Sequence, residues 1–140
     1  MKYIAFDIGD KRIGVAVSDP FGDFAMPLET YYRKNFQKDV EYLINLAKQR
    51  YADVIVCGLP LNFDGSESEQ TIKTKSFVEE MKKRTEIPIV FEDERFTTMQ
   101  AQRVLLEADM RRNDRKTVVD KIAASYILET YMQKQKNKGN

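Results

Sequence analysis

The amino-acid sequence predicts an α/β fold: a five-stranded mixed sheet, made of an antiparallel three-strand meander plus two parallel strands and flanked by helices. Two observations predict it. Short apolar runs joined by turn-forming residues occupy the first part of the chain, and amphipathic segments then alternate with further apolar runs. The chain has 140 residues, which fits one domain spanning 1–140 around a single core.

The meander is predicted from the N-terminal third of the chain. Alternation of apolar and small residues indicates strands at 2–7 and 13–18, and a weaker third strand near 24–28. Gly9 lies in the turn between the first two strands, where crowded or left-handed backbone favours glycine. We therefore expect a hairpin that holds Asp7 at the mouth of the first strand.

The parallel half is predicted from the middle of the chain. Apolar residues at three- and four-residue spacings indicate an amphipathic helix over 36–50 and a second near 67–84, which presents Ile72 to the core. The continuous apolar run 54–59 is typical of a parallel strand buried on both faces, and 87–91 is the next strand. Right-handed crossovers place the first strand centrally, beside the fourth.

The C-terminal third is predicted to be mainly helical. A capped helix is expected from about 99 to 107, followed by a polar and basic loop at 110–116. A final helix is expected from about 117 to 133, and the polar residues 134–140 are expected to fray.

The composition limits the classes of function. The hydrophobic fraction of 42% and charged fraction of 32% are those of a soluble globular protein, and no stretch reaches the roughly 18 apolar residues of a membrane helix. No apolar signal region begins the sequence, so a cytoplasmic location is expected. The net charge of +1 indicates that any affinity for nucleic acid comes from a local basic patch.

Histidine is absent, which directs attention to the acidic residues. Without imidazole there is no Ser-His or Cys-His nucleophile pair and no His-ligated zinc. The lone Cys57 lies inside an apolar run and is interpreted as a small core residue. Carboxylates, lysines, tyrosines and hard metal ions are the chemistry that remains.

Three acidic residues are candidates for a metal site. Asp7 and Glu94 fall at the carboxyl ends of predicted strands, where open α/β sheets bind ligands, and Asp120 lies beside the apolar stripe of the final helix. Three converging carboxylates repel one another unless a divalent cation neutralises them, so we expect Mg²⁺ or Mn²⁺. The alternatives are a plain hairpin with a surface Asp7, and an Asp120 favoured only by the dipole of a helix N-terminus.

Four motifs, taken in order, resemble the YqgF family of the ribonuclease H-like superfamily. They are Asp7-x-Gly9 with Lys11 and Gly14, Gly58-Leu59-Pro60-Leu61 with Asp64-Gly65, Asp93-Glu94-Arg95 with Thr97-Thr98, and Asp120-x-x-Ala123-Ala124. The resemblance covers nearly the whole chain. Members of this family are described as pre-16S rRNA nucleases and, earlier, as Holliday junction resolvases.

The resemblance implies a ribonuclease H-like fold and a metal-dependent endonuclease that hydrolyses phosphodiester bonds in structured nucleic acid. Asp7, Glu94 and Asp120 then correspond to the acidic triad, as catalytic residues and metal ligands. Asp93 is the alternative to Glu94, because successive strand residues point to opposite faces and only one faces the site. The expected substrate is the 5′ end of pre-16S rRNA, in ribosome biogenesis, with branched DNA as the rival, and the expected state is a monomer or weak homodimer.

Basic residues near these motifs are candidates for contacts with the nucleic-acid backbone. Arg95 is expected either to pair with phosphate or to hold Asp93 or Glu94 in place. Tyr31 and Tyr32 could stack on a base, although packing is the more common role for such a pair. The backbone-binding candidates are Lys11, Arg12, Arg95, Arg111, Arg112, Arg115 and Lys116.

Two further classes of function remain open. An actin-like nucleotide-binding module has a comparable Asp-x-Gly hairpin, but those ATPases close two domains around the nucleotide, and 140 residues supply one. A non-catalytic RNA-binding assembly factor could keep the fold and cleave nothing. Tight binding of ATP with magnesium would favour the first class, and binding of nucleic acid in chelator without cleavage would favour the second.

Overall fold

A computed structural model describes residues 1–95 and 112–138, with side chains left undescribed at 112–117. Five strands form one mixed sheet with the order β3-β2-β1-β4-β5, so β1 is central and lies beside β4, as predicted. The α/β class with an antiparallel and a parallel half is confirmed. The strands are β1 (Tyr3–Ile8), β2 (Arg12–Ser18), β3 (Ala25–Tyr32), β4 (Val54–Leu59) and β5 (Ile89–Asp93).

The direction of each strand follows from the connection that precedes it. β1, β2 and β3 pair antiparallel through short turns, whereas β1 pairs with β4, and β4 with β5, in parallel. Parallel neighbours need a crossover, which α1 (Phe36–Gln49) and α2 (Glu69–Lys82) supply. The carboxyl ends of β1, β4 and β5 therefore lie at one edge of the sheet.

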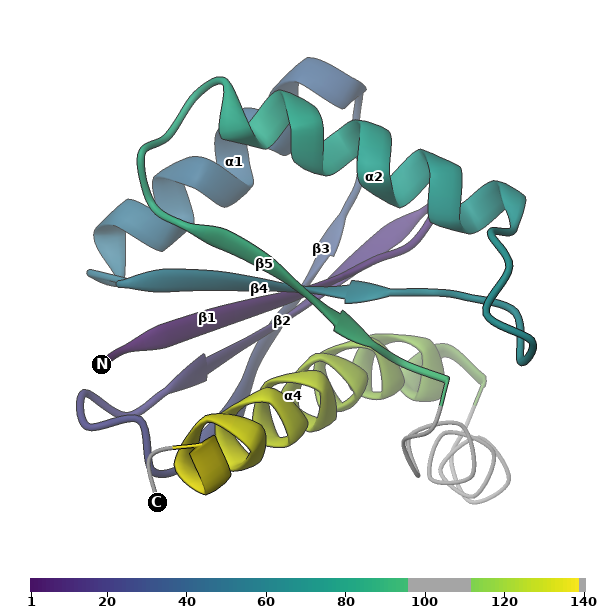
Figure 1. The fold of residues 1–140 in the computed structure, drawn as a ribbon. Coiled ribbons are helices and arrows are strands. Elements are labelled where there is room, and N and C mark those ends of the chain that lie inside the picture. The colour runs from purple at the N-terminus through teal and green to yellow at the C-terminus, as the bar shows by residue number, and fades with distance from the viewer. Residues whose placement is uncertain (96–111, 139–140) are drawn as a thin grey trace.

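Helices cover both faces of the sheet (Figure 1). α1 and α2 lie on one face, where Ile4 and Phe6 of β1 join the core cluster that contains Phe77. The long helix α4 (Arg112–Lys138) lies on the other face, where Tyr3 and Ala5 join a second cluster with residues of that helix. We call this second side the α4 face. Alternate residues along β1 are therefore divided between two cores.

The C-terminal helix is longer than predicted at both ends. α4 begins at Arg112, inside the segment 110–116 that was expected to be a loop, and continues to Lys138, beyond the expected end at residue 133. Ion pairs of Lys134 with Glu92 and of Lys136 with Asp23 attach the polar end of α4 to the rest of the protein. These partners are remote in sequence, so composition alone predicted fraying. The helix expected at 99–107 lies outside the described residues.

The prediction for Ile72 is wrong, because its side chain is 60% exposed. α2 begins with a capping box between Ser68 and Thr71, and the Thr71 hydroxyl also donates to the carbonyl oxygen of Pro60. This contact turns Thr71 and Thr74 toward the core and Ile72 toward solvent. None of the helices in the described part of the chain has the length and apolar character needed to cross a bilayer.

Candidate active site

Asp7 is the second-to-last residue of β1 and lies toward the carboxyl edge of the sheet. It is two residues beyond Ala5 and four beyond Tyr3, both of which belong to the core under α4, so strand alternation places Asp7 on the α4 face. Its partner across the antiparallel pair is Gly14 of β2, which has no side chain to cover it. Asp7 remains partly exposed, as a ligand-binding carboxylate requires.

Asp120 is brought to the same place by close packing of α4 on β2. A Cβ atom built on Gly14 would lie 1.8 Å from the Asp120 backbone oxygen, so α4 contacts β2 where a side chain is missing. Gly14 is therefore opposite Asp7 within the sheet and directly under Asp120. Asp120 lies eight residues after Arg112, far beyond the first turn in which a helix dipole favours acids. The dipole explanation for Asp120 is wrong.

Glu94 follows β5 and turns to the α4 face over β4. Its backbone N–H donates to the Leu59 carbonyl oxygen at 3.3 Å, which extends the strand pairing by one residue. A Cβ atom built on Gly58 would lie 2.9 Å from Glu94 Oε1 and 2.6 Å from Ile127 Cδ1 of α4. Glu94 is thus only 9% exposed, and its carboxylate lies between β4 and α4.

The Asp93 carboxylate, unlike that of Glu94, is paired with a neighbouring guanidinium group, that of Arg95. Its carboxylate accepts hydrogen bonds from the backbone N–H of Arg95 at 2.8 Å and from Arg95 Nε at 2.9 Å. The Arg95 guanidinium also covers Gly65, in the loop after β4, where a Cβ atom would lie 2.8 Å from Nη1. Of the two neighbouring acids, Glu94 faces α4. Arg95 holds Asp93 in place, which is one of the two roles expected for this arginine.

Arg12 forms an ion pair that the sequence analysis did not predict. Its Nε lies 2.6 Å from Asp120 Oδ2, in an ion pair whose side chains are 25% and 18% exposed respectively. Lys11 is exposed. Arg12 thus contacts a candidate catalytic acid and neutralises its charge. Arg111 lies outside the described residues, and so do the side chains of Arg112, Arg115 and Lys116.

The donor set has the chemistry of a site for a hard divalent cation, because Asp7, Glu94 and Asp120 offer only carboxylate oxygens. Gly14 and Gly58 leave the space in which Asp120 and Glu94 approach the sheet. Within residues 1–95 and 112–138, however, no three His, Cys, Asp or Glu side chains are grouped so that they could hold a metal ion. The residues therefore fit such an ion in the chemistry of their side chains, while the Asp120 carboxylate is paired with Arg12.

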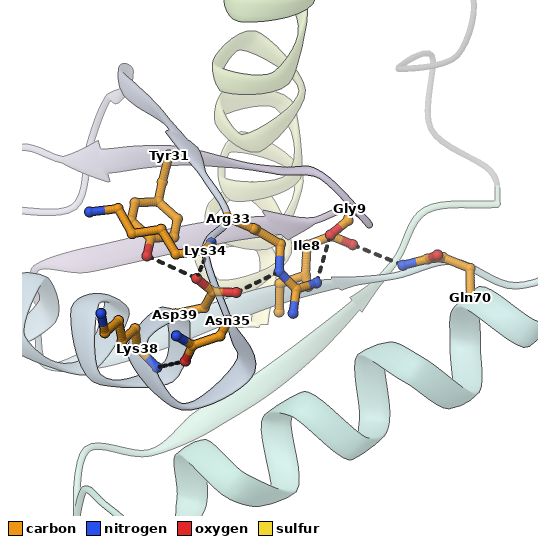
Figure 2. A network of polar contacts seen from close by, with 9 residues as sticks. All are labelled: Ile8, Gly9, Tyr31, Arg33, Lys34, Asn35, Lys38, Asp39 and Gln70. Carbon is orange, nitrogen blue, oxygen red and sulfur yellow. Dashed lines mark hydrogen bonds and ion pairs between the residues drawn. The ribbon is translucent and has the colours of Figure 1, made fainter.

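A polar network on the opposite face fixes the backbone that carries Asp7 (Figure 2). Arg33 Nη1 donates to the Gly9 carbonyl oxygen at 2.9 Å, and Gln70 Nε2 of α2 donates to the Ile8 carbonyl oxygen at 3.1 Å. These two carbonyl groups directly follow Asp7 in the chain. The network therefore connects the end of β1 to the segment before α1 and to α2.

Asp39 is the buried acceptor at the centre of this network (Figure 2), with only 1% of its surface exposed. Burial raises the pKa of the Asp39 carboxyl, but the Lys34 backbone N–H, the Arg33 guanidinium and the Tyr31 hydroxyl all donate to it and together lower its pKa below the ordinary value. Burial and the bond to Asp39 raise the pKa of Tyr31 to about 12. Sequence reasoning missed this network, although Asp39 stands next to Val40 on the apolar stripe of α1.

Glu92 is a second buried acid that sequence reasoning missed. It lies on β5, two residues before Glu94 and on the same face, and it is 4% exposed. Lys134 of α4 forms an ion pair with it. The available signal was the alternation along β5, which places Glu92 and Glu94 on one side.

The burial of side chains bears on two further expectations, for the tyrosine pair Tyr31 and Tyr32 and for Cys57. Tyr31 packs against Tyr42 with ring centroids 4.3 Å apart, whereas Tyr32 is 56% exposed. Packing is thus the role of Tyr31. Cys57 is fully buried, and burial raises the pKa of its thiol to about 12, as expected for a core residue.

Comparison with known proteins decides the family. A family model described as "RuvX: Holliday junction resolvase" matches residues 1–134. The chain belongs to this RuvX family. Relatives include proteins from Clostridium acetobutylicum, 45% identical over 94% of this chain and 98% of the relative, and from Thermoanaerobacter pseudethanolicus, 45% identical over 99% of this chain and 100% of the relative. Both are named "Putative pre-16S rRNA nuclease".

Solved structures establish the fold of this RuvX family member as ribonuclease H-like. The fowlpox virus resolvase in complex with Holliday junction DNA is similar with a TM-score of 0.60 at 13% identity, covering 96% of this chain and 99% of that one. Thermus thermophilus RuvC in complex with a Holliday junction substrate is similar with a TM-score of 0.56 at 9% identity, covering 94% and 96%. At such low identity these structures indicate the fold alone.

Proposed function

We propose that this protein is a metal-dependent endonuclease that acts on structured nucleic acid and processes the 5′ end of pre-16S rRNA. Membership of the RuvX family makes the chain a nuclease, which hydrolyses phosphodiester bonds. The names of the relatives, at about 45% identity over nearly the whole chain, support the RNA substrate. We further propose that it acts in the cytoplasm as a monomer or weak homodimer.

One observation carries the assignment of the site. Gly14 is the neighbour of Asp7 across the hairpin and lies in contact with the backbone of Asp120, so both acids, 113 positions apart in the chain, adjoin the same glycine on the α4 face. Glu94 reaches the same face from β5 through the space over Gly58. This convergence supports Asp7, Glu94 and Asp120 as the catalytic residues.

The three carboxylates would hold Mg²⁺ or Mn²⁺, whose preferred ligands are oxygen atoms. Such an ion supplies charge neutralisation at the scissile phosphate and activation of the attacking water. Asp7 lies on β1, which is central in the sheet and whose end is held by the Arg33 and Gln70 hydrogen bonds, and this rigid support favours its role as a ligand. Lys11, exposed on the turn after β1, is placed to contact the nucleic-acid backbone.

The proposal is tested with two substrates and a matched pair of variants. A pre-16S rRNA fragment and a synthetic four-way DNA junction are incubated with the protein in Mg²⁺, in Mn²⁺ and in chelator. We expect cleavage of the RNA with either ion and none in chelator. Asp7→Asn should reduce the rate at least about 100-fold, because a metal ligand is lost. Undiminished cleavage by Asp7→Asn would refute the site.

Asp10→Asn is the control variant for Asp7. It removes a carboxylate three residues after Asp7, in the turn that follows β1. The Asp10 side chain is 62% exposed, and its Oδ1 lies 3.3 Å from Lys73 Nζ. We expect its cleavage rate to stay close to that of the unchanged protein. Binding of RNA in chelator, with no cleavage under any condition, would instead favour the non-catalytic assembly factor.

Branched DNA is the second candidate substrate, and the family description favours it. A resolvase acts on paired strands of a four-way junction, so the DNA arm of the experiment distinguishes it from RNA processing. Cleavage of the junction with the RNA left intact would replace the first proposal while keeping the same three carboxylates.

A further inference from the structure

The ion pair between Arg12 and Asp120 conflicts with a simple metal site. Asp120 offers its Oδ2 to Arg12 Nε at 2.6 Å, and a charge-assisted bond of this length is among the stronger contacts of a protein surface. A cation bound to the same oxygen would place two positive groups on one carboxylate. The two partners therefore compete for Asp120.

We propose that Arg12 is a positioning residue that changes partner when a divalent cation binds. Without the cation it forms the ion pair with Asp120, and with the cation bound it turns toward the nucleic-acid phosphates. This inference rests on the proposed function, because it assumes that Asp120 ligates the cation. The observation behind it is the direction of the Asp120 carboxylate, whose Oδ2 faces Arg12 Nε.

The position of Arg12 supports this exchange. Arg12 is the first residue of β2 and pairs with Tyr32 of the edge strand, so its backbone is fixed while its side chain remains 25% exposed. It lies two residues before Gly14, and strand alternation therefore puts its side chain on the α4 face with Asp7. A guanidinium in this position can turn from a carboxylate to a phosphate, because its planar fork binds both.

The exchange would also control charge. Without a cation, Arg12 offsets one of the acids that meet at this edge, which lowers the repulsion among Asp7, Glu94 and Asp120. With a cation, that compensation is no longer needed, and the freed guanidinium adds a positive group for the substrate. Cation binding and phosphate binding would then favour each other, as linked equilibria must.

The first test measures Mn²⁺ binding to the full chain without nucleic acid, by calorimetry. Arg12→Gln removes the competitor and should bind Mn²⁺ about 3- to 10-fold more tightly, which corresponds to the net strength of a partly exposed ion pair. Arg12→Lys, which keeps the charge but not the fork, should fall between the two. Unchanged or weaker binding by Arg12→Gln would overturn the inference.

Two further variants make the result specific. Arg84→Gln breaks a comparable ion pair, with Arg84 Nη2 3.0 Å from Glu80 Oε1 on α2, and should leave Mn²⁺ binding unchanged. Asp120→Asn removes the contested ligand and should weaken Mn²⁺ binding whether or not Arg12 is present. If the unchanged protein binds no Mn²⁺, the proposed metal site itself fails; if it binds Mn²⁺ and Arg12→Gln does not alter the affinity, only the role of Arg12 fails.

The second test measures binding of a labelled pre-16S rRNA fragment by fluorescence anisotropy across a salt series. With Ca²⁺, another hard cation with oxygen ligands, Arg12→Gln should bind the RNA more weakly, and the slope of log affinity against log salt should fall by about 1. In chelator, the variant and the unchanged protein should bind equally. An equal loss in both conditions would show that Arg12 contacts phosphate permanently, and would overturn the exchange.

Discussion

The carboxylate of Glu94 lies over Gly58, on the face of β4 where a side chain would otherwise stand. Val54 and Val56 fill the corresponding positions earlier in the same strand, so Gly58 makes a gap in an otherwise filled face. This gap allows Glu94, the residue that follows β5, to reach the α4 face while remaining 9% exposed.

Gly58→Ala should impair the site more than the fold. The new methyl group would lie 2.9 Å from Glu94 Oε1 and 2.6 Å from Ile127 Cδ1, so both side chains must move. Overpacking of this kind costs about 1–3 kcal/mol of unfolding free energy. We expect nuclease activity to fall at least about tenfold, as for a ligand that is displaced. Urea unfolding and cleavage rates are the measurements.

Val56→Ala is the control for this substitution, because Val56 lies on the same face of the same strand and is fully buried. Removing its two methyl groups should cost about 1–3 kcal/mol without touching Glu94. If both variants lose activity in proportion to their stability, Gly58 has no particular role in the site.

Gly14→Ala is predicted to be far more damaging to the fold. A Cβ atom there would lie 1.8 Å from the Asp120 backbone oxygen and 3.1 Å from the Lys121 nitrogen, and helix backbone cannot yield as a flexible side chain does. α4 would have to separate from β2, with a loss above about 3 kcal/mol. Circular dichroism and thermal unfolding check this, and a variant with an unchanged melting temperature would contradict the packing of α4 described above.

Asp39 is predicted to make stability depend on pH in the acid range. The pKa of its carboxyl is lowered in the folded protein, so its contribution is fully present above the ordinary value of 3.8 and is lost as the pH falls through the lower folded value. Asp39→Asn should cost about 1–3 kcal/mol at pH 7, because buried donors lose a charged acceptor. The difference between the two proteins should shrink below about pH 4.

Unfolding in urea at several pH values between about 2.5 and 7 measures this effect. Asp19→Asn is a useful comparison, since the pKa of Asp19 is also lowered by backbone hydrogen bonds, chiefly from Phe24, but in an exposed turn. A stability difference for Asp39→Asn that stays constant from neutral to acid pH would show that its carboxylate is not the origin of the effect.

Lys134 is predicted to stabilise the end of α4 through Glu92. Lys134→Met leaves a buried carboxylate without its cation and should cost about 1–3 kcal/mol, less than for a fully buried pair because Lys134 is 55% exposed. Adding Glu92→Gln should restore most of that loss. A double-mutant cycle measured by urea unfolding gives the coupling, and additive effects would mean that the ion pair contributes nothing to the attachment of α4.

Much of the fold was predictable because it depends on local patterns. A few neighbouring residues are enough to indicate each of these elements: the alternating strands β1 and β2, the amphipathic helix α1 and the continuous apolar strand β4. The rule for crossovers then places β1 beside β4. The errors occur where a distant contact overrides the local pattern. The ends of α4 and the exposure of Ile72 depend on partners such as Glu92 and Pro60, which no window of sequence contains.

The candidate site divides in the same way. The residue types set the available chemistry: no histidine, one cysteine within an apolar run, and acids at predicted strand ends in motifs shared with a nuclease family. The surroundings of those acids depend on the packing of elements that are distant in the chain, because packing sets which atoms approach one another. It turns Glu94 rather than Asp93 to the α4 face, packs Asp120 on Gly14, and pairs Asp120 with an arginine 108 residues away. The sequence specifies which side chains are charged, but the partner of each charged side chain is set only when the helices pack on the sheet.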